Sequence, residues 1–130
     1  MEPTTCTYVI GRDQSAREKL HRSFEATGLG AAWQADSLHS LMPPHVCYPE
    51  PNIVLVDITH MAGDLRTQLV EIQKEYPGAT FLLMSEKVTS ALLMEYLPIG
   101  IGGVLPLDID PQMLRYSLEL LLDDTLMAMN

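Results

Sequence analysis

A buried strand that ends in a carboxylate constrains this chain more than any other feature. Residues 53–56 read Ile-Val-Leu-Val, a continuous β-branched and aliphatic run, and Asp57 follows directly. Such a run is typical of a strand that is covered on both faces, as in the centre of a parallel sheet. In open α/β sheets, functional sites form at the carboxyl ends of these strands. Asp57 is therefore the first candidate for a functional residue.

The length and composition favour one globular domain. The chain has 130 residues, of which 47% are hydrophobic, and this is enough to bury a core. No apolar run approaches the ~20 residues of a membrane span, and the N-terminus lacks the pattern of a signal peptide. Cys6 and Cys47 do not have the spacing of a metal site. We therefore expect reduced thiols and a cytoplasmic protein without membrane contacts.

The net charge argues against direct binding to nucleic acids. Seventeen acidic residues against eight basic ones give a formal net charge of −9. A surface of this sign repels phosphate backbones. We expect contacts with DNA only through a domain that this chain does not contain.

Hydrophobic runs and capping signals predict strands that alternate with helices. Asp13 and Asp64 are predicted to cap two of the helices, and Asp110 with Pro111 marks the start of the last. The predicted strands are Thr7–Gly11, a short one near Ala31–Gln34, Ile53–Val56, Thr80–Met84 and one within Ile101–Leu107. The predicted helices are Gln14–Ala26, a brief one from Ser37 to Leu41, Leu65–Tyr76, Thr89–Leu97 and one from Asp110 to about Leu122.

This alternation predicts the topology of the sheet. Five strands interleaved with five helical segments imply a parallel sheet that is covered on both faces. Right-handed crossovers place the strands in the order 2-1-3-4-5, which is the flavodoxin-like order. We expect residues 1–130 to form a single α/β domain.

The segment from Gly100 to Pro111 carries a resemblance to a known family. It reads Gly-Ile-Gly-Gly-Val-Leu-Pro-Leu-Asp-Ile-Asp-Pro and follows, without gaps, the Gly-Ala-x-Gly-Tyr-Leu-Leu-Lys-Asp-x-x-Pro pattern of NarL/LuxR-type regulators. With the order of the elements, it makes nearly the whole chain resemble a receiver domain of the response-regulator family, typified by CheY. The resemblance implies a (βα)5 three-layer sandwich. It also implies that residues 122–130 lead toward a C-terminal effector domain.

The resemblance also implies where a phosphorylation site would lie. In a working receiver, two acids after the first strand hold Mg²⁺, and an aspartate after the third strand accepts the phosphoryl group. A hydroxyl after the fourth strand and a lysine after the fifth bind the phosphate oxygens. The metal ion and the lysine offset the negative charge on these oxygens. Val104 stands at the aromatic switch position of the family. Gly11 and Arg12 stand at the positions of the two acids, and Asp57 stands at the position of the acceptor. Ser85 stands at the position of the hydroxyl, and Leu107 at that of the lysine.

Two of these elements are missing, because neither the acidic pair nor the lysine is present. Asp13 could supply at most one carboxylate, whereas Mg²⁺ requires several oxygen ligands in octahedral geometry. We expect Mg²⁺ binding to be absent and phosphorylation of Asp57 to be slow or absent. The chain therefore resembles an atypical receiver, or pseudo-receiver, that has no catalytic residues and no cofactor.

Arg12 and Asp57 each have two interpretations. The guanidinium of Arg12 could occupy the place of the metal and pair with Asp57, or it could point into solvent. Asp57 could have a regulatory role, or it could be a leftover acid that caps the following loop. The sequence leaves both questions open.

Surplus apolar residues on the last two predicted helices suggest a homodimer. They exceed what one buried stripe per helix requires, so these helices and the fifth strand are the expected interface. The alternative is that these apolar side chains are buried in a thick core of the domain itself. The residues are Ala91, Leu92, Leu93, Met94, Tyr96 and Leu97 in the first helix, and Met113, Leu114, Leu118, Leu120, Leu121 and Leu122 in the second.

Three functions follow from the resemblance. The favoured one is a phosphorylation-independent module of a two-component system that controls a transcription regulator through dimerisation or protein docking. The second is a phospho-accepting receiver in which Asp57 carries the aspartyl phosphate. The third is a receiver similar to that of the antiterminator AmiR, which would bind a repressor protein.

Overall fold

Five parallel strands form the centre of the molecule, in the order β2-β1-β3-β4-β5. A computed structural model describes residues 5–41, 50–61 and 63–128. The strands are β1 (Thr5–Ile10), β2 (Gly30–Ala35), β3 (Ile53–Asp57), β4 (Thr80–Ser85) and β5 (Gly103–Pro106). The helices are α1 (Gln14–Thr27), α2 (Leu65–Glu75), α3 (Ser90–Tyr96) and α4 (Pro111–Ala128), with 3-10 turns η1 (Leu38–Leu41) and η2 (Leu97–Ile99). The predicted α/β class and strand order are confirmed.

The central strand β3 has the environment that its sequence predicts. Every residue of β3 is buried, and the strand pairs with β1 on one side and β4 on the other. A strand buried on both faces must be apolar at every position, which explains the continuous run. Asp57 is the exception, and it closes the strand at the carboxyl edge of the sheet.

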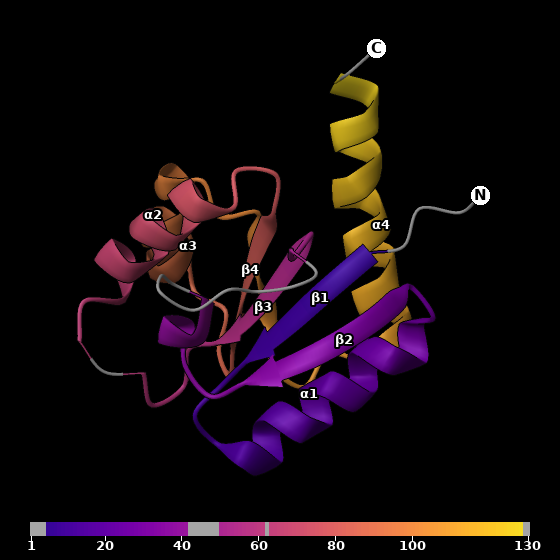
Figure 1. Ribbon diagram of the computed structural model, residues 1–130, viewed down its shortest axis with the longest axis horizontal. Coiled ribbons are helices and arrows are strands. Elements are labelled where there is room, and N and C mark those ends of the chain that lie inside the picture. Colours follow the sequence, from indigo (N-terminus) through magenta and orange to yellow (C-terminus); the bar gives the residue numbers. More distant parts are fainter. Residues whose placement is uncertain (1–4, 42–49, 62, 129–130) are drawn as a thin grey trace.

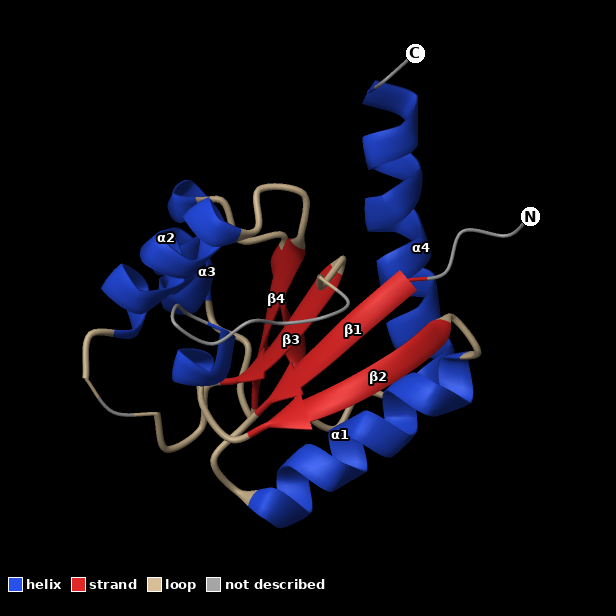
Figure 2. Cartoon of the chain, in the orientation of Figure 1, coloured by secondary structure: helices blue, strands red, loops and turns tan. Residues whose placement is uncertain are grey.

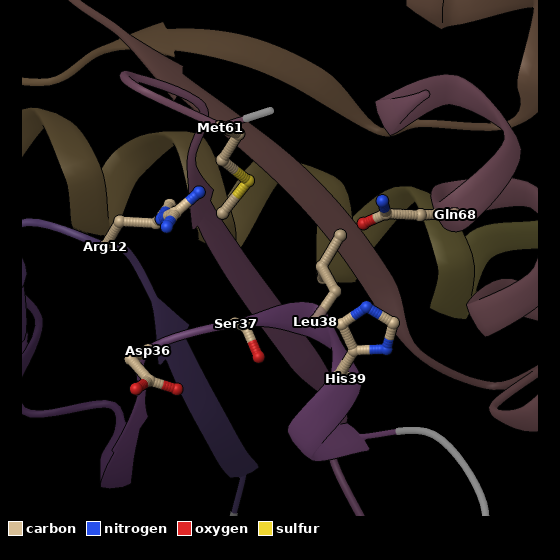
Figure 3. A pocket seen from close by; sticks show the side chains of 7 residues that line it. All are labelled: Arg12, Asp36, Ser37, Leu38, His39, Met61 and Gln68. Carbon is tan, nitrogen blue, oxygen red and sulfur yellow. The ribbon is translucent and has the colours of Figure 1, made fainter. Parts of the chain in front are cut away.

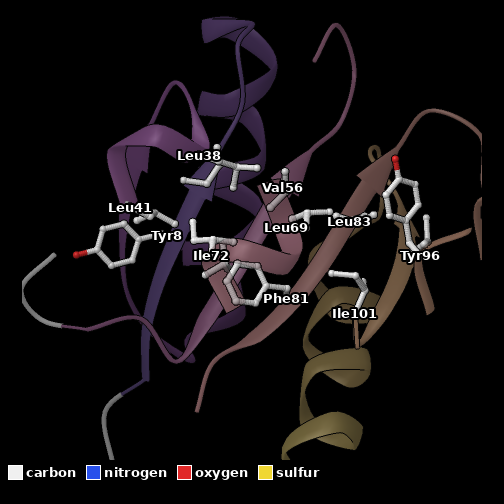
Figure 4. Packing of buried hydrophobic residues seen from close by; sticks show 13 residues of the cluster. Tyr8, Leu38, Leu41, Val56, Leu69, Ile72, Phe81, Leu83, Tyr96 and Ile101 are labelled. Carbon is white, nitrogen blue, oxygen red and sulfur yellow. The ribbon is translucent and has the colours of Figure 1, made fainter. Parts of the chain in front are cut away.

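Helices cover both faces of the sheet (Figures 1 and 2). On one face, α1 and α4 pack side by side and bury Leu20, Phe24, Leu114 and Leu118 against the strands. On the other face, α2, α3 and η1 cover a second cluster, which Figure 4 shows in detail. That cluster is built from Tyr8, Ile10, Leu38, Leu41, Val54, Val56, Leu69, Ile72, Phe81, Leu83, Tyr96, Ile101 and Val104.

Helix α1 begins and ends where its capping signals predict. The side chain of Asp13 accepts hydrogen bonds from the backbone N–H groups of Ser15 and Ala16. Gly28 ends the helix in the left-handed conformation, with φ of 73°, which other residues rarely adopt. The predicted N-cap of α1 is therefore confirmed.

The brief helix predicted from Ser37 to Leu41 is present as a 3-10 turn, η1. The described residues contain four α-helices besides the 3-10 turns. Pro43 and Pro44 follow in the sequence, and proline cannot continue a helix. Trp33 of β2 stacks on Tyr8 with ring centroids 5.7 Å apart and is 37% exposed.

The last helix is longer than predicted. It was expected to end at about Leu122, but α4 continues to Ala128 and extends beyond the sheet (Figure 1). The segment 122–128 contains neither glycine nor proline, and leucine, methionine and alanine are strong helix formers, so nothing local ends the helix. Within the described residues, no helix is long and apolar enough to span a membrane.

Candidate functional site

The carboxyl edge of the sheet brings the predicted site residues together. Ile10 pairs with Val56 in the ladder between β1 and β3, so Gly11 lies beside Asp57. A Cβ atom added at Gly11 would lie only 3.3 Å from the Cβ atom of Asp57. The backbone of β1 therefore forms one wall around the carboxylate.

Strands β4 and β5 place the other two predicted positions on the far side of Asp57. Asp57 pairs with Met84 in the ladder, and Ser85 follows Met84 directly. The backbone N–H of Leu107 donates to the carbonyl oxygen of Ser85 at 2.8 Å. Gly11, Asp57, Ser85 and Leu107 thus follow one another along the edge of the sheet.

Asp57 is buried, with only 1% of its surface exposed. Its Oδ1 atom accepts a hydrogen bond from the backbone N–H of Thr59 at 2.9 Å. Its Oδ2 atom is also buried and has no hydrogen-bond partner among the described residues. A buried carboxylate oxygen without a partner destabilises the fold. This arrangement is typical of a site that is retained for a reason other than stability.

An arginine does bind at this edge of the sheet, next to Gly11, and it is Arg17. From α1, its Nη1 atom donates to the carbonyl oxygen of Gly11 at 2.7 Å and its Nε atom to Oε1 of Gln34 at 3.0 Å. The guanidinium therefore binds the end of β1 and the edge strand β2. Sequence reasoning missed this residue, although its position four residues after Asp13 puts it on the first turn of α1.

Arg12 does not form the hypothesised ion pair with Asp57. Its side chain is exposed, and the described residues contain no ion pair between Arg12 and any carboxylate. Figure 3 shows its side chain extending toward Met61, with which it lines a cavity. The solvent-facing interpretation is the one that the structure supports.

The hydroxyl of Ser85 is bound within its own loop. Its Oγ atom donates to the carbonyl oxygen of Lys87 at 2.9 Å and accepts from the backbone N–H of Lys87 at 3.3 Å. The half-buried side chain of Leu107 packs against the apolar cluster under α1 and α4. Val104 is 7% exposed and belongs to the cluster on the opposite face. An aliphatic residue therefore occupies the place where the family has its lysine.

The donor set does not fit the Mg²⁺ ion that the receiver fold implies. The carboxylate of Asp13 already caps α1, at 3.0 Å from the N–H of Ser15. In the part of the chain that the structure describes, no group of three or more histidine, cysteine, aspartate or glutamate side chains could hold a metal ion. Asp57 alone cannot provide the oxygens that this ion requires.

Comparisons with known proteins find similarity at the level of the fold. No family model matches the chain, and no curated protein matches it. A protein from Burkholderia thailandensis named for pilus assembly (cpaE) superposes with a TM-score of 0.81 and 18% identity, covering 92% of this chain and 99% of that one. A CheY-like receiver domain protein from Methanospirillum hungatei gives 0.73 and 14%, with 94% and 96% covered. The signal receiver domain of NarL from Mycobacterium tuberculosis gives 0.69 and 20%, also with 94% and 96% covered.

These similarities show the fold of the chain. Five parallel strands in the order 2-1-3-4-5, covered by helices, match the CheY-like flavodoxin fold of the structural neighbours. The predicted fold class is therefore confirmed, and receiver domains are among the solved structures that share it.

Proposed function

We propose that this chain is a receiver-like signalling module that works without phosphorylation. It acts by forming a homodimer or by docking a protein partner, and the partner it controls is a transcription regulator. The CheY-like fold and the likeness to the NarL receiver domain support this assignment. Asp57 occupies the phospho-acceptor position but does not serve as a phosphate carrier.

The environment of Asp57 is the observation that carries the proposal. Phosphoryl transfer needs positive charge around the equatorial oxygens of the phosphate. Around this carboxylate, the positions of the family's charged groups are held by Gly11 and Leu107, and the nearby guanidinium of Arg17 binds backbone and amide oxygens. Without an ammonium group or a metal ion, the transferred charge would be left uncompensated.

Apolar side chains on the last two helices support a protein partner or a second copy as the output. Large hydrophobic side chains are exposed at seven positions among the described residues, and five of them lie in α3, η2 and α4. Exposed apolar side chains gathered on neighbouring elements mark interaction surfaces. They are Met94, Leu97, Met113, Tyr116 and Leu120.

The likeness to the pilus assembly protein favours a second candidate function. Its TM-score of 0.81 exceeds that of the two receiver domains above, and the similarity covers 99% of that chain. In this second candidate, the receiver-like domain docks a component of a pilus assembly apparatus instead of a transcription regulator. A pull-down with the tagged chain from its own host, followed by mass spectrometry, separates the two by the class of protein that co-purifies.

Titration with beryllofluoride and Mg²⁺, followed by NMR, tests phosphorylation independence. Beryllofluoride mimics the phosphoryl group on aspartate, so a competent receiver shows saturable shifts of backbone amides around the acceptor. We expect no saturable shift at Asp57, Ser85 or Val104, because the positive charge that would hold the mimic is missing.

Two variants make this experiment decisive. Asp57→Asn removes the acceptor and identifies shifts that come from nonspecific salt effects. The triple variant Gly11→Asp, Arg12→Asp, Leu107→Lys restores the family's charged groups and serves as the reference for a competent site. Saturable shifts in the native chain that disappear in Asp57→Asn would contradict the proposal.

A further inference from the structure

A polar cavity of about 410 Å³ opens at the carboxyl edge of the sheet, on the β2 side of Asp57. Arg12 reaches it from the end of β1, and Asp36 and His39 reach it from the segment that follows β2. Met61 closes it from the loop after β3, and Gln68 from α2 (Figure 3). Its volume falls within the roughly 300–1,000 Å³ of small-molecule sites.

The cavity lies where the topology of the sheet favours a ligand. The strand order reverses between β1 and β3: the chain leaves β1 through α1 on one face of the sheet and leaves β3 through α2 on the other. At such a reversal, the two connections separate and leave a crevice outside the carboxyl ends of the strands. The position of the cavity is therefore a consequence of the fold.

Four of the polar side chains that line this cavity have no other interaction in the described part of the chain. Within the described residues, the side chains of Arg12, Asp36, His39 and Gln68 form no hydrogen bond or ion pair. A single solvated side chain would be ordinary, but these four come from three separate segments and line one cavity (Figure 3). A few convergent polar groups in a crevice are the usual composition of a ligand site.

The neighbouring end of α1 does not compete for an anion. Its first free N–H groups, those of Ser15 and Ala16, are already bound by the carboxylate of Asp13. Among the residues that line the cavity, Arg12 supplies a permanently charged cation that can bind an anion. Its planar fork suits a phosphate group, which it can bind through two parallel hydrogen bonds.

We propose that this cavity binds a small phosphorylated sugar, either free or as part of a mononucleotide. Arg12 binds the phosphate group, and the carboxylate of Asp36, which can only accept hydrogen bonds, binds the sugar hydroxyl groups. Gln68 and His39 bind a further polar group of the ligand. Met61 supplies an apolar wall for the carbon skeleton. The site is separate from the phospho-acceptor position, and the proposal does not rest on the function proposed above.

One tight turn connects the cavity with Asp57. The backbone N–H of Met61 donates to the carbonyl oxygen of Ile58 at 3.2 Å, and His60 within this turn has a φ of 62°. Thr59, in the same turn, donates its N–H to Asp57. A histidine with a left-handed backbone conformation is uncommon, and it indicates that the surrounding structure fixes the conformation of this turn. A ligand that contacts Met61 therefore also changes the environment of the Thr59 amide.

NMR titration of the full 130-residue chain tests the proposal. The probes are ribose 5-phosphate, adenosine 5′-monophosphate and inorganic phosphate, each added to about 10 mM. We expect saturable shifts of the backbone amides of Arg12, Asp36, Thr59 and Met61 with at least one of the two sugar phosphates. Tighter binding of the mononucleotide than of ribose 5-phosphate would identify a nucleotide site, and the reverse order would identify a sugar-phosphate site.

Matched variants show whether the cavity itself is responsible. Arg12→Ala should weaken sugar-phosphate binding by about tenfold or more, because it removes a charge-assisted pair. Asp36→Asn should weaken binding of the sugar phosphates but not that of inorganic phosphate. Arg22→Ala removes another exposed arginine, on α1, that lies outside the cavity, and it should leave the affinity unchanged.

Three results would overturn the proposal. The first is the absence of saturable shifts with both sugar phosphates. The second is equal affinity in Arg12→Ala and Arg22→Ala, and the third is inorganic phosphate binding as tightly as the sugar phosphates. Arg12 is exposed and unpartnered, so its replacement should not unfold the chain, and unchanged amide shifts away from the cavity would verify this. None of these results affects the outcome of the beryllofluoride experiment.

Discussion

At the end of β3, the carboxylate of Asp57 is almost inaccessible to water, and only one of its oxygens accepts a hydrogen bond. In a working receiver, a metal ion and an ammonium group would balance such a charge. Here Gly11 and Leu107 stand in their place. At the scale of the residue, the chain therefore keeps a charged group whose compensating partners are missing.

Replacing Asp57 by asparagine should stabilise the fold. Asparagine preserves the shape and the acceptor for the Thr59 N–H but removes the buried charge on Oδ2. We expect the free energy of unfolding to rise by about 1–3 kcal/mol, because an unpaired charge costs more to bury than the neutral amide that replaces it. Urea unfolding followed by circular dichroism measures the change.

The exposed Asp108 provides the control for this prediction. Asp108→Asn removes the same charge from the surface and should change the free energy of unfolding by less than about 0.5 kcal/mol. A decrease in stability for Asp57→Asn would mean that Oδ2 has a stabilising partner.

The helices of this chain begin at capping side chains that the sequence itself identifies. Asp64 accepts a hydrogen bond from the backbone N–H of Thr67 at 3.1 Å and one from its hydroxyl. Asp110 accepts from the N–H groups of Gln112 and Met113 at the start of α4. Each cap satisfies N–H groups that a helix cannot satisfy internally. At the scale of the element, short-range sequence signals are therefore sufficient to predict where these helices begin.

The cap of α2 should be visible in the titration of Asp64. The hydrogen bonds from the Thr67 hydroxyl and backbone N–H favour the charged carboxylate, so they hold the pKa of Asp64 below its usual value of 3.8. The charged cap therefore stabilises the start of α2 above about pH 4, and this contribution is lost as the pH falls through the lowered pKa. NMR titration of the side-chain carboxyl group measures the shift.

A variant of Thr67 separates this cause from the general acidity of the chain. Thr67→Val removes the hydroxyl hydrogen bond, and the pKa of Asp64 should move back toward its usual value. Ser90→Ala, an exposed change at the start of α3, should leave the pKa of Asp64 where it is. If Thr67→Val has no effect, the hydroxyl is not the main cause.

The whole molecule presents different surfaces at its two sheet edges. The edge strand β2 carries small or polar residues and a single tryptophan, whereas α3, η2 and α4, next to the other edge strand, carry five exposed large hydrophobic side chains. Among the described residues, five of the seven exposed large hydrophobic side chains thus lie on α3, η2 and α4, and a second copy or a docked partner would bury them.

Static light scattering should show a dimer whose mass does not change when acetyl phosphate and Mg²⁺ are added. Met94 is 77% exposed on α3, so Met94→Lys should place a charge in the interface and reduce the mass by about half. Ala31→Lys, on the opposite edge strand, should remain a dimer. A native chain that is monomeric, or that dimerises only with acetyl phosphate, would contradict the proposed mode of action.

Much of the fold could be predicted because its signals are local. The apolar runs of β3 and β4 predict strands that are buried on both faces, and the caps at Asp13 and Asp64 predict helix starts to the residue. Because the connections between parallel strands are right-handed, one strand order is then favoured over the others. The candidate acceptor site could be predicted in part, since strand ends gather at one edge whatever lies between them in the sequence.

The sequence by itself determined the class, the order of the strands and the absence of the charged groups at Gly11 and Leu107, because these depend on residue type and on patterns within a few residues. Only the tertiary structure decided that Arg17 binds the carbonyl oxygen of Gly11, and that Arg12 lines a cavity with Asp36 instead of pairing with Asp57. Those outcomes depend on which way a side chain points at a strand end. Packing between strands that are distant in the sequence sets that direction, so local sequence patterns do not predict it.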